Sequence, residues 1–217
     1  MVDSYKHKGR RAFLVEVLKE KGIEDPKVLE AISKVPRHFF LPSAFDDFAY
    51  KDEAFPIAAN QTISQPFTVA FQSSLLEAKP GEAVLEIGTG SGYQSCVLIE
   101  MGVNLYTIER QKDLFDFSKQ IFKKLRLTPK HQSFGDGYKG LPLFAPFDKI
   151  LVTAASATMP KELLKQLKIG GIMVLPLGEE EQMMTKIIRK SEKEFVKQEL
   201  GDCKFVPMLR DREDGQN

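Results

Sequence analysis

A run of uncharged polar side chains precedes a helical pattern, and its chemistry allows two uses. Gln61, Thr62, Ser64 and Gln65 stand together without a charge, and Pro66 follows them. Ser64 suits the cap of a helix that begins near Pro66, because its hydroxyl can accept a hydrogen bond from a free N–H group of the first turn. The same N–H groups and the helix dipole also attract a carboxylate or a phosphate. The stretch therefore predicts a helix start that is also a potential anion site, and the residues alone leave both uses open.

A glycine loop between a predicted strand and a predicted helix is the second group that can do chemistry. The segment Glu86–Tyr93 reads EIGTGSGY, and its glycines allow a sharp turn and a close approach to a ligand. A nucleotide-like cofactor suits such a loop, and a tight structural turn is the simpler alternative. The loop departs from the dinucleotide fingerprint G-x-G-x-x-G, because its third glycine, Gly92, falls one residue early. A lysine-containing phosphate loop is also absent from the sequence, so hydride transfer and phosphoryl transfer are both disfavoured.

Two acidic residues follow the next predicted strands. Glu109 closes a strand at 104–109, where a carboxylate can accept hydrogen bonds from both ribose hydroxyls, unless it is only a solvent-facing strand end. Asp136 precedes Gly137 after a weak strand pattern at 131–134; it can accept a hydrogen bond from an exocyclic amine or simply form a turn. Because open α/β sheets bind ligands at the carboxyl ends of their strands, the joint occurrence of these groups favours a binding site.

The remaining candidate residues exclude several other kinds of site. His7, His38 and His131 share no spacing, so each is expected to be structural or exposed. Cys96 and Cys203 lie far apart, which argues against a disulfide framework and against a zinc site. We therefore expect no metal, and a reducing compartment is the simplest interpretation.

Charge and hydropathy limit the partners. The 217 residues include 31 lysines and arginines and 30 aspartates and glutamates, interspersed, so the basic footprint of a nucleic-acid-binding protein is missing. No run reaches the ~18 apolar residues of a membrane span, and the first residues lack the apolar region of a signal peptide. We expect a cytoplasmic, soluble protein with neither nucleic acid nor membrane as a partner.

The elements that must position these residues follow from hydrophobic periodicity. The pattern predicts helices over 5–21 and 26–35, then an irregular, aromatic and proline-rich segment over 37–66. Strands and helices alternate afterwards, which predicts an α/β fold with a doubly wound, mostly parallel sheet. The last two strand patterns lack a helix between them and predict an antiparallel hairpin at the sheet edge.

We expect one domain over 1–217, acting as a monomer. Within it, 1–80 forms an N-terminal helical and substrate-covering segment, and 81–178 forms the cofactor-binding core. Residues 179–210 form C-terminal edge strands, and 211–217 form a charged, frayed tail.

Motifs along nearly the whole chain resemble the class I S-adenosylmethionine-dependent methyltransferases, which are Rossmann-like, and within them the protein-L-isoaspartate O-methyltransferase family. They are QTISQP, VLEIGTGSGYQ, YTIE, GDGYKGLP, FDKILVTAA, LKIGGIMVLPLG and FVPML. QTISQP is specific to the family and not merely to the fold. Leu209, in FVPML, stands where some members have a polar residue, so no cofactor contact is transferred to it.

The resemblance implies S-adenosylmethionine as cofactor, S-adenosylhomocysteine as product, and isoaspartyl-containing proteins and peptides as substrates. By resemblance the glycine loop holds the methionine and ribose side, Glu109 the ribose hydroxyls, and Asp136 with Gly137 the adenine. The resemblance also implies that Ser64 hydrogen-bonds the carboxylate that receives the methyl group, and that Val206 supplies backbone contacts to the peptide. The implied cofactor-binding residues are Thr62, Ile63, Ser64, Gly88, Thr89, Gly90, Ser91, Gly92, Glu109, Asp136 and Gly137.

The chemistry of the acceptor agrees with the absence of a catalytic base. A peptide α-carboxyl group has a pKa of ~3.5 and is already ionised at neutral pH, so positioning and removal of water remain as the tasks of the protein. A methyltransferase that acts on a small molecule and a cofactor-binding module without turnover stay open as alternatives. An RNA methyltransferase is disfavoured by the charge balance.

Overall fold

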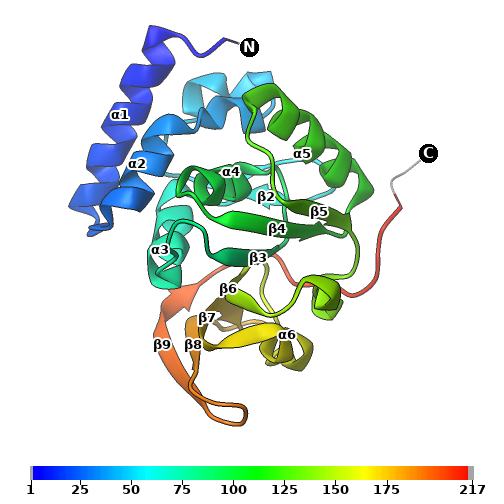
Figure 1. Ribbon diagram of the computed structural model, residues 1–217. Coiled ribbons are helices and arrows are strands. Elements are labelled where there is room, and N and C mark those ends of the chain that lie inside the picture. The colour runs from blue at the N-terminus through cyan, green and yellow to red at the C-terminus, as the bar shows by residue number, and fades with distance from the viewer. Residues whose placement is uncertain (1, 215–217) are drawn as a thin grey trace.

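The structure is a computed structural model that describes residues 2–214, and a seven-stranded sheet forms its centre (Figure 1). The strands lie in the order β5-β4-β3-β6-β7-β8-β9. Neighbours from β5 to β7 pair in parallel, whereas β8 pairs antiparallel with both β7 and β9. The bounds are β3 Ala83–Ile87, β4 Asn104–Glu109, β5 His131–Phe134, β6 Phe147–Val152, β7 Leu167–Leu177, β8 Gln182–Arg189 and β9 Phe195–Cys203. The predicted α/β fold with an antiparallel C-terminal hairpin is confirmed.

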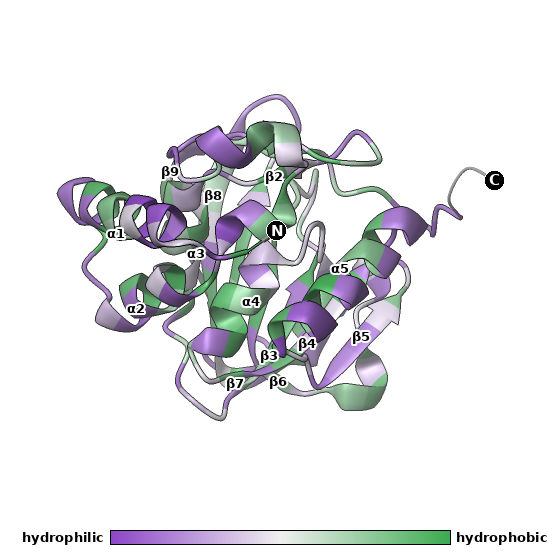
Figure 2. Ribbon diagram, turned by 90° about the horizontal axis from the view of Figure 1, so that it is seen from above, coloured by the Kyte–Doolittle hydropathy of each residue, from purple (hydrophilic) through white to green (hydrophobic). Residues whose placement is uncertain are grey.

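Helices cover both faces of the sheet. Successive strand residues point to opposite faces, and apolar side chains on each face pack against the helices there. Val84 of β3 packs on the side of the N-terminal helices, while its neighbour Leu85 packs on the side of α6. Figure 2 shows α4 as mostly hydrophobic, whereas the edge strand β5 is mostly hydrophilic. The bounds are α1 Tyr5–Glu20, α2 Pro26–Lys34, α3 Pro66–Leu76, α4 Tyr93–Glu100, α5 Lys112–Leu125 and α6 Lys161–Gln166. No helix within residues 2–214 has the length and apolar character that a membrane crossing requires.

The segment 37–66 is better organised than its sequence suggests. It contains the 3-10 helices η1 (Arg37–Phe40) and η2 (Ser43–Phe48). A short antiparallel pair follows, formed by β1 (Phe55–Pro56) and β2 (Thr62–Ile63). Aromatic side chains that give no periodic pattern, such as Phe39 and Phe40, are buried against the helices. The segment therefore packs down and places β2 near the carboxyl ends of β3 and β4.

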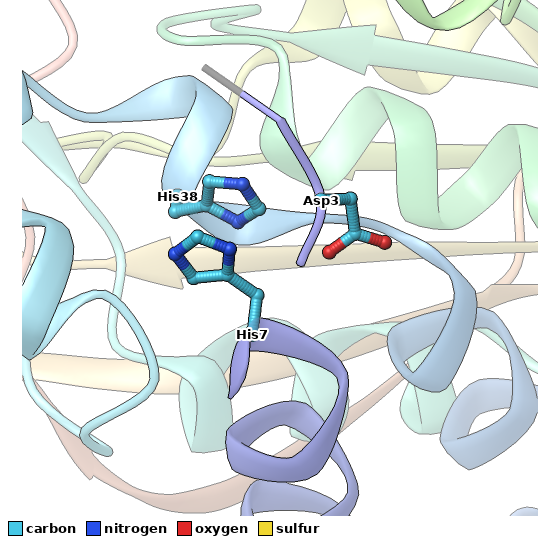
Figure 3. Close-up of side chains that lie close together, drawn as sticks. All are labelled: Asp3, His7 and His38. Carbon is cyan, nitrogen blue, oxygen red and sulfur yellow. The ribbon is translucent and has the colours of Figure 1, made fainter. Parts of the chain in front are cut away.

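Figure 3 shows the rings of His7, from α1, and His38, from η1, lying next to each other. The rings of His7 and His38 stack with centroids 3.8 Å apart and an interplanar angle of 12°. Arg11 Nη1 donates to the Tyr50 hydroxyl at 3.1 Å, and His38 Nδ1 shares a hydrogen bond of 2.7 Å with the same hydroxyl. Burial lowers the pKa of His38, which favours the neutral ring. Both histidines are structural, as expected.

The same group does not suit a metal ion, although it combines two histidines with Asp3. A metal must lie in the plane of each imidazole ring that binds it, and two nearly parallel stacked rings do not share such a position. Both Asp3 carboxylate oxygens also accept hydrogen bonds from Arg11, each at 3.1 Å. The group is best described as a packing and hydrogen-bonding cluster.

Candidate functional site

A cavity lies at the carboxyl ends of β3, β4 and β6, where the strand order reverses on either side of β3. Open α/β sheets bind ligands at this position, because the loops diverge there and leave a crevice. Most residues predicted from the sequence line this cavity together. They are Thr62, Ile63, Ser64, Gly88, Thr89, Gly90, Ser91, Glu109, Gly137 and Val206.

The glycine loop turns directly out of β3 into α4. Gly88 has φ of +93°, and a Cβ atom there would lie 2.5 Å from Thr153 Oγ1, so only glycine fits without displacing Thr153. The Gly88 N–H donates to the Ile108 carbonyl group at 2.9 Å, which holds the loop against β4. The loop is therefore a fixed cradle built by its neighbours.

Glu109 faces the same cavity from the end of β4. Its two carboxylate oxygens accept hydrogen bonds from the backbone N–H groups of Gly90 (2.7 Å) and Gln111 (2.8 Å). Burial raises the pKa of Glu109, and these backbone hydrogen bonds oppose the rise. A carboxylate offers about four lone-pair positions, so two remain for ligand hydroxyl groups. Glu109 can thus orient a ribose while it also orders the glycine loop.

Two residues of the predicted set do not line the cavity. Gly92 lies at the start of α4, where an added Cβ atom would meet Phe122 and Ser118 of α5. Its position permits close packing of two helices. Asp136 is buried, and its carboxylate accepts the Tyr138 N–H at 2.9 Å, capping the 3-10 helix η3 (Gly137–Lys139). Its backbone neighbour Gly137 reaches the cavity instead.

The start of α3 corrects the expectation that Ser64 caps this helix. The helix begins at Pro66, and neither Ser64 nor Gln65 supplies a side-chain cap. Asp52, from the loop before β1, accepts the Phe67 N–H at 2.7 Å and the Gln65 side-chain amide at 3.0 Å. Asp52 also pairs with Lys21 at 2.6 Å. A carboxylate of the chain itself therefore occupies the anion position that the sequence left open.

Ser64 is consequently available to the cavity. Among the described residues its hydroxyl forms no hydrogen bond, and its carbonyl oxygen accepts one from Arg37 at 2.9 Å. Because Ser64 does not cap α3, its hydroxyl remains an uncharged donor beside the glycine loop. Sequence reasoning missed Asp52, because a cap that lies fourteen residues before the helix leaves no local pattern.

Val206 borders the cavity on the side of β6. Its carbonyl oxygen accepts the Ala155 N–H at 2.8 Å, and the Met208 N–H donates to the Ala155 carbonyl at 2.7 Å. The chain thus runs beside the end of β6 like a short added strand. The Val206 N–H has no hydrogen-bond partner among the described residues. Leu209, to which no contact was transferred, also lines the cavity.

Beneath the loop lies Glu86, which is fully buried. The hydroxyl groups of Ser95 and Thr107 donate to one of its carboxylate oxygens, the latter at 2.7 Å. The other oxygen has no partner among the described residues. Burial raises the pKa of Glu86 to about 7. Glu86 supports the loop from below and is absent from the cavity lining.

Arg110 lines the cavity and is held by the C-terminal segment, and the sequence predicted neither feature. The Glu213 N–H donates to the Arg110 carbonyl at 2.8 Å, and the two side chains pair at 3.0 Å. The Lys112 N–H donates to the Glu213 carbonyl at 3.0 Å. The expected frayed tail at 211–217 therefore needs correction for 211–214, which these backbone bonds hold against the end of β4; 215–217 lie outside the described residues. Thr153 also lines the cavity and was not predicted. It directly follows β6, so the rule that ligands bind at the carboxyl ends of strands could have identified it.

Comparison with known sequences identifies the family. The family model described as Protein-L-isoaspartate(D-aspartate) O-methyltransferase matches residues 9–213. A protein-L-isoaspartate O-methyltransferase of Flavobacterium johnsoniae is 58% identical over 212 residues, which cover 98% of this chain and 100% of the relative.

Solved structures agree with the sequence comparison. A protein-L-isoaspartate O-methyltransferase aligns with a TM-score of 0.81 and 26% identity, covering 91% of this chain and 65% of the other. A crystal structure from Plasmodium falciparum, provisionally described as the same enzyme, contains S-adenosyl-L-homocysteine. It aligns with a TM-score of 0.79 and 27% identity, covering 94% of this chain and 98% of the other. The extent of these matches leaves one conclusion: the chain belongs to the protein-L-isoaspartate O-methyltransferase family.

Proposed function

We propose that the protein transfers a methyl group from S-adenosylmethionine to the free α-carboxylate of L-isoaspartyl residues in proteins and peptides, with S-adenosylhomocysteine as the second product. Family membership supports the reaction. The single structural observation that carries it is the position of Ser64, an unengaged hydroxyl donor that lines one cavity with the glycine loop and Glu109. The expectations of a monomer and of a cytoplasmic location stay predictions.

The residues of the cavity fit the cofactor. Glu109 has lone pairs left for two ribose hydroxyls, and the backbone at Gly88 lies too close to Thr153 for any side chain. Apolar side chains of Ile108 and Leu114 offer a surface for an aromatic base. The cofactor supplies an activated methyl group on a sulfonium sulfur, which leaves as a neutral thioether.

The acceptor needs orientation more than activation. An α-carboxylate is ionised at neutral pH, so no general base is required. Within residues 2–214, no histidine or lysine lines the cavity, and Arg110, the one basic side chain of that lining, is paired with Glu213. The Ser64 hydroxyl can hold one carboxylate oxygen while the other faces the methyl group. An uncharged donor orients the carboxylate without forming an inert ion pair.

The product explains the proposed biological role. A methyl ester has a better leaving group than the carboxylate, so the neighbouring peptide nitrogen displaces methanol and closes a succinimide. Hydrolysis of the succinimide then gives back some normal aspartyl linkages. The resulting role is the repair of aged proteins.

The first experiment compares two peptides that differ only in having L-isoaspartate or L-aspartate. We expect base-labile methyl label from S-adenosylmethionine only in the isoaspartyl peptide. Label in neither peptide, with binding of S-adenosylhomocysteine intact, would reject the proposed acceptor.

Replacement of Ser64 tests its assigned role. We expect Ser64→Ala to lower kcat/KM for the isoaspartyl peptide about 10- to 100-fold, which corresponds to one hydrogen bond to a charged group. Affinity for S-adenosylhomocysteine, measured by calorimetry, should change less than about threefold. Ser74→Ala is the control, because among the described residues the Ser74 hydroxyl hydrogen-bonds the Ala70 carbonyl within α3 and no other group. Equal kcat/KM in both variants would remove Ser64 from the mechanism.

A further inference from the structure

Arg37 is a buried arginine that contacts the backbone of Ser64 from outside the cavity. It begins η1, and its side chain is 0% exposed. Its Nη2 donates to the Ser64 carbonyl at 2.9 Å and more weakly to the Glu53 carbonyl at 3.4 Å. Its guanidinium carbon lies 4.6 Å from the ring centroid of Tyr93, the first residue of α4. Arg37 thus links the segment that carries Ser64 to the helix that follows the glycine loop.

The guanidinium of Arg37 is poorly satisfied. Within residues 2–214 it forms no ion pair with a carboxylate, and its Nε and Nη1 atoms have no hydrogen-bond partner. The nearby Asp52 carboxylate is engaged by Phe67, Gln65 and Lys21. Arginine stays protonated in proteins, so the interior contains a positive charge that backbone carbonyls and one aromatic ring offset only in part.

A buried charge that its surroundings offset only in part is costly, and an anion that arrives nearby reduces that cost. Ser64 and Tyr93 line the cavity, whereas Arg37 does not. The charge therefore lies one layer behind the cavity wall. At that position it attracts an anion without contacting it, and a nearby anion is less screened by water than one at the surface.

We propose that Arg37 is a positioning residue of the acceptor site with two effects. Its hydrogen bond fixes the Ser64 backbone so that the Ser64 hydroxyl faces the acceptor. Its charge favours a carboxylate over a neutral group at the acceptor position. This inference rests on the proposed function. It predicts that the enzyme distinguishes a free α-carboxylate from an α-carboxamide of the same shape, and that Arg37 produces much of the distinction.

The experiment measures the affinities of two peptides for the enzyme bound to S-adenosylhomocysteine, so that no turnover occurs. One peptide has the isoaspartyl α-carboxylate and the other its α-carboxamide. We expect the wild-type protein to prefer the carboxylate at least tenfold. Arg37→Gln should reduce that preference at least fivefold, with affinity for S-adenosylhomocysteine changed less than about threefold.

Arg37→Lys separates the charge from the hydrogen-bonding geometry. Lysine keeps the charge as a single point donor, so we expect the carboxylate preference to be largely retained while kcat falls at least fivefold. This variant also tests the proposal if Arg37→Gln does not fold, because wild-type kcat and KM in Arg37→Lys would overturn it.

Arg11→Gln is the matched control. Arg11 is another buried arginine of the N-terminal region, bonded to the Ser33 carbonyl at 2.6 Å, and it does not line the cavity. We expect it to lower stability and leave the peptide preference unchanged. An equal loss of preference in the Arg11 and Arg37 variants, or no loss in a folded Arg37→Gln, would overturn the proposal. Failure of the wild-type protein to methylate the isoaspartyl peptide would instead overturn the proposed function.

Discussion

Glu86 shows how one side chain supports the loop at a cost in stability. Its carboxyl group is fully buried, and only one of its oxygens is hydrogen-bonded among the described residues. Burial raises the pKa of Glu86 to about 7, from 4.5 for a free carboxyl group. The folded protein therefore keeps a proton between pH 4.5 and 7 that the unfolded chain releases. Because of Glu86, the free energy of unfolding falls as the pH rises from 4.5 to about 7.

Glu86→Gln is expected to remove that fall. The amide keeps an acceptor for Ser95 and Thr107 and does not ionise, so the variant should gain on the order of 3 kcal/mol relative to the wild-type protein between pH 4.5 and 8. Urea unfolding across this range measures the difference. Glu16→Gln, at an exposed position on α1, is the control and should keep the wild-type pH dependence. Parallel curves for Glu86→Gln and the wild-type protein would show that Glu86 ionises normally in the fold.

The start of α3 is the element that places Ser64 at the cavity. Asp52 bonds the first turn of α3, and Lys21 connects the same carboxylate to the end of α1. β2 and Ser64 lie directly before this helix. The position of the Ser64 hydroxyl is therefore set by a loop from earlier in the chain.

We expect Asp52→Ala to lower the free energy of unfolding by about 1–2 kcal/mol, the usual cost of a lost cap. It should also weaken S-adenosylhomocysteine binding, because β2 loses its fixed connection. Asp25→Ala removes a similar cap from α2, where Asp25 accepts the Lys27 N–H at 2.9 Å, far in the chain from the cavity residues. Urea unfolding and calorimetry separate the two effects. Binding that is weakened equally in both variants would argue for general loosening instead.

At the scale of the whole molecule, the cluster around His38 ties α1 to the segment 37–66, whose residues 61–64 line the cavity. Burial, and next the neighbouring His7, lower the pKa of His38; Asp3 and Asp46 oppose this. The unfolded chain therefore binds a proton near pH 6.5 that the folded protein accepts only at lower pH. Stability from His38 is present above pH 6.5 and is lost as the pH falls through the folded pKa.

His38→Phe should flatten this acid dependence while it lowers stability at pH 8, because Tyr50 loses its hydrogen bond with the His38 ring. Urea unfolding between pH 8 and pH 5 gives both quantities. His131→Gln is the control and should keep the wild-type slope, because His131 lies in the edge strand β5, where its ring is tilted against that of Phe144. A slope that is unchanged in His38→Phe would assign the acid sensitivity to other groups.

The sequence by itself determined the parts of this protein that depend on neighbours in the chain. Hydrophobic periodicity located the strands and helices, and the glycine loop between β3 and α4 marked the cavity, since positive φ values and strand ends are local properties. The strand-end rule then brought Glu109 and Gly137 to one place. The family motif singled out Ser64.

Only the tertiary structure decided what surrounds Ser64. Asp52 caps α3, and Arg37 donates a hydrogen bond to the Ser64 carbonyl. Glu213 pairs with Arg110, which lies 103 positions earlier in the chain. None of these contacts has a periodicity or a fixed spacing, because each depends on how the irregular segments fold back over the sheet. Pairing between distant residues is a property of the chain path, and that path is set when the core packs.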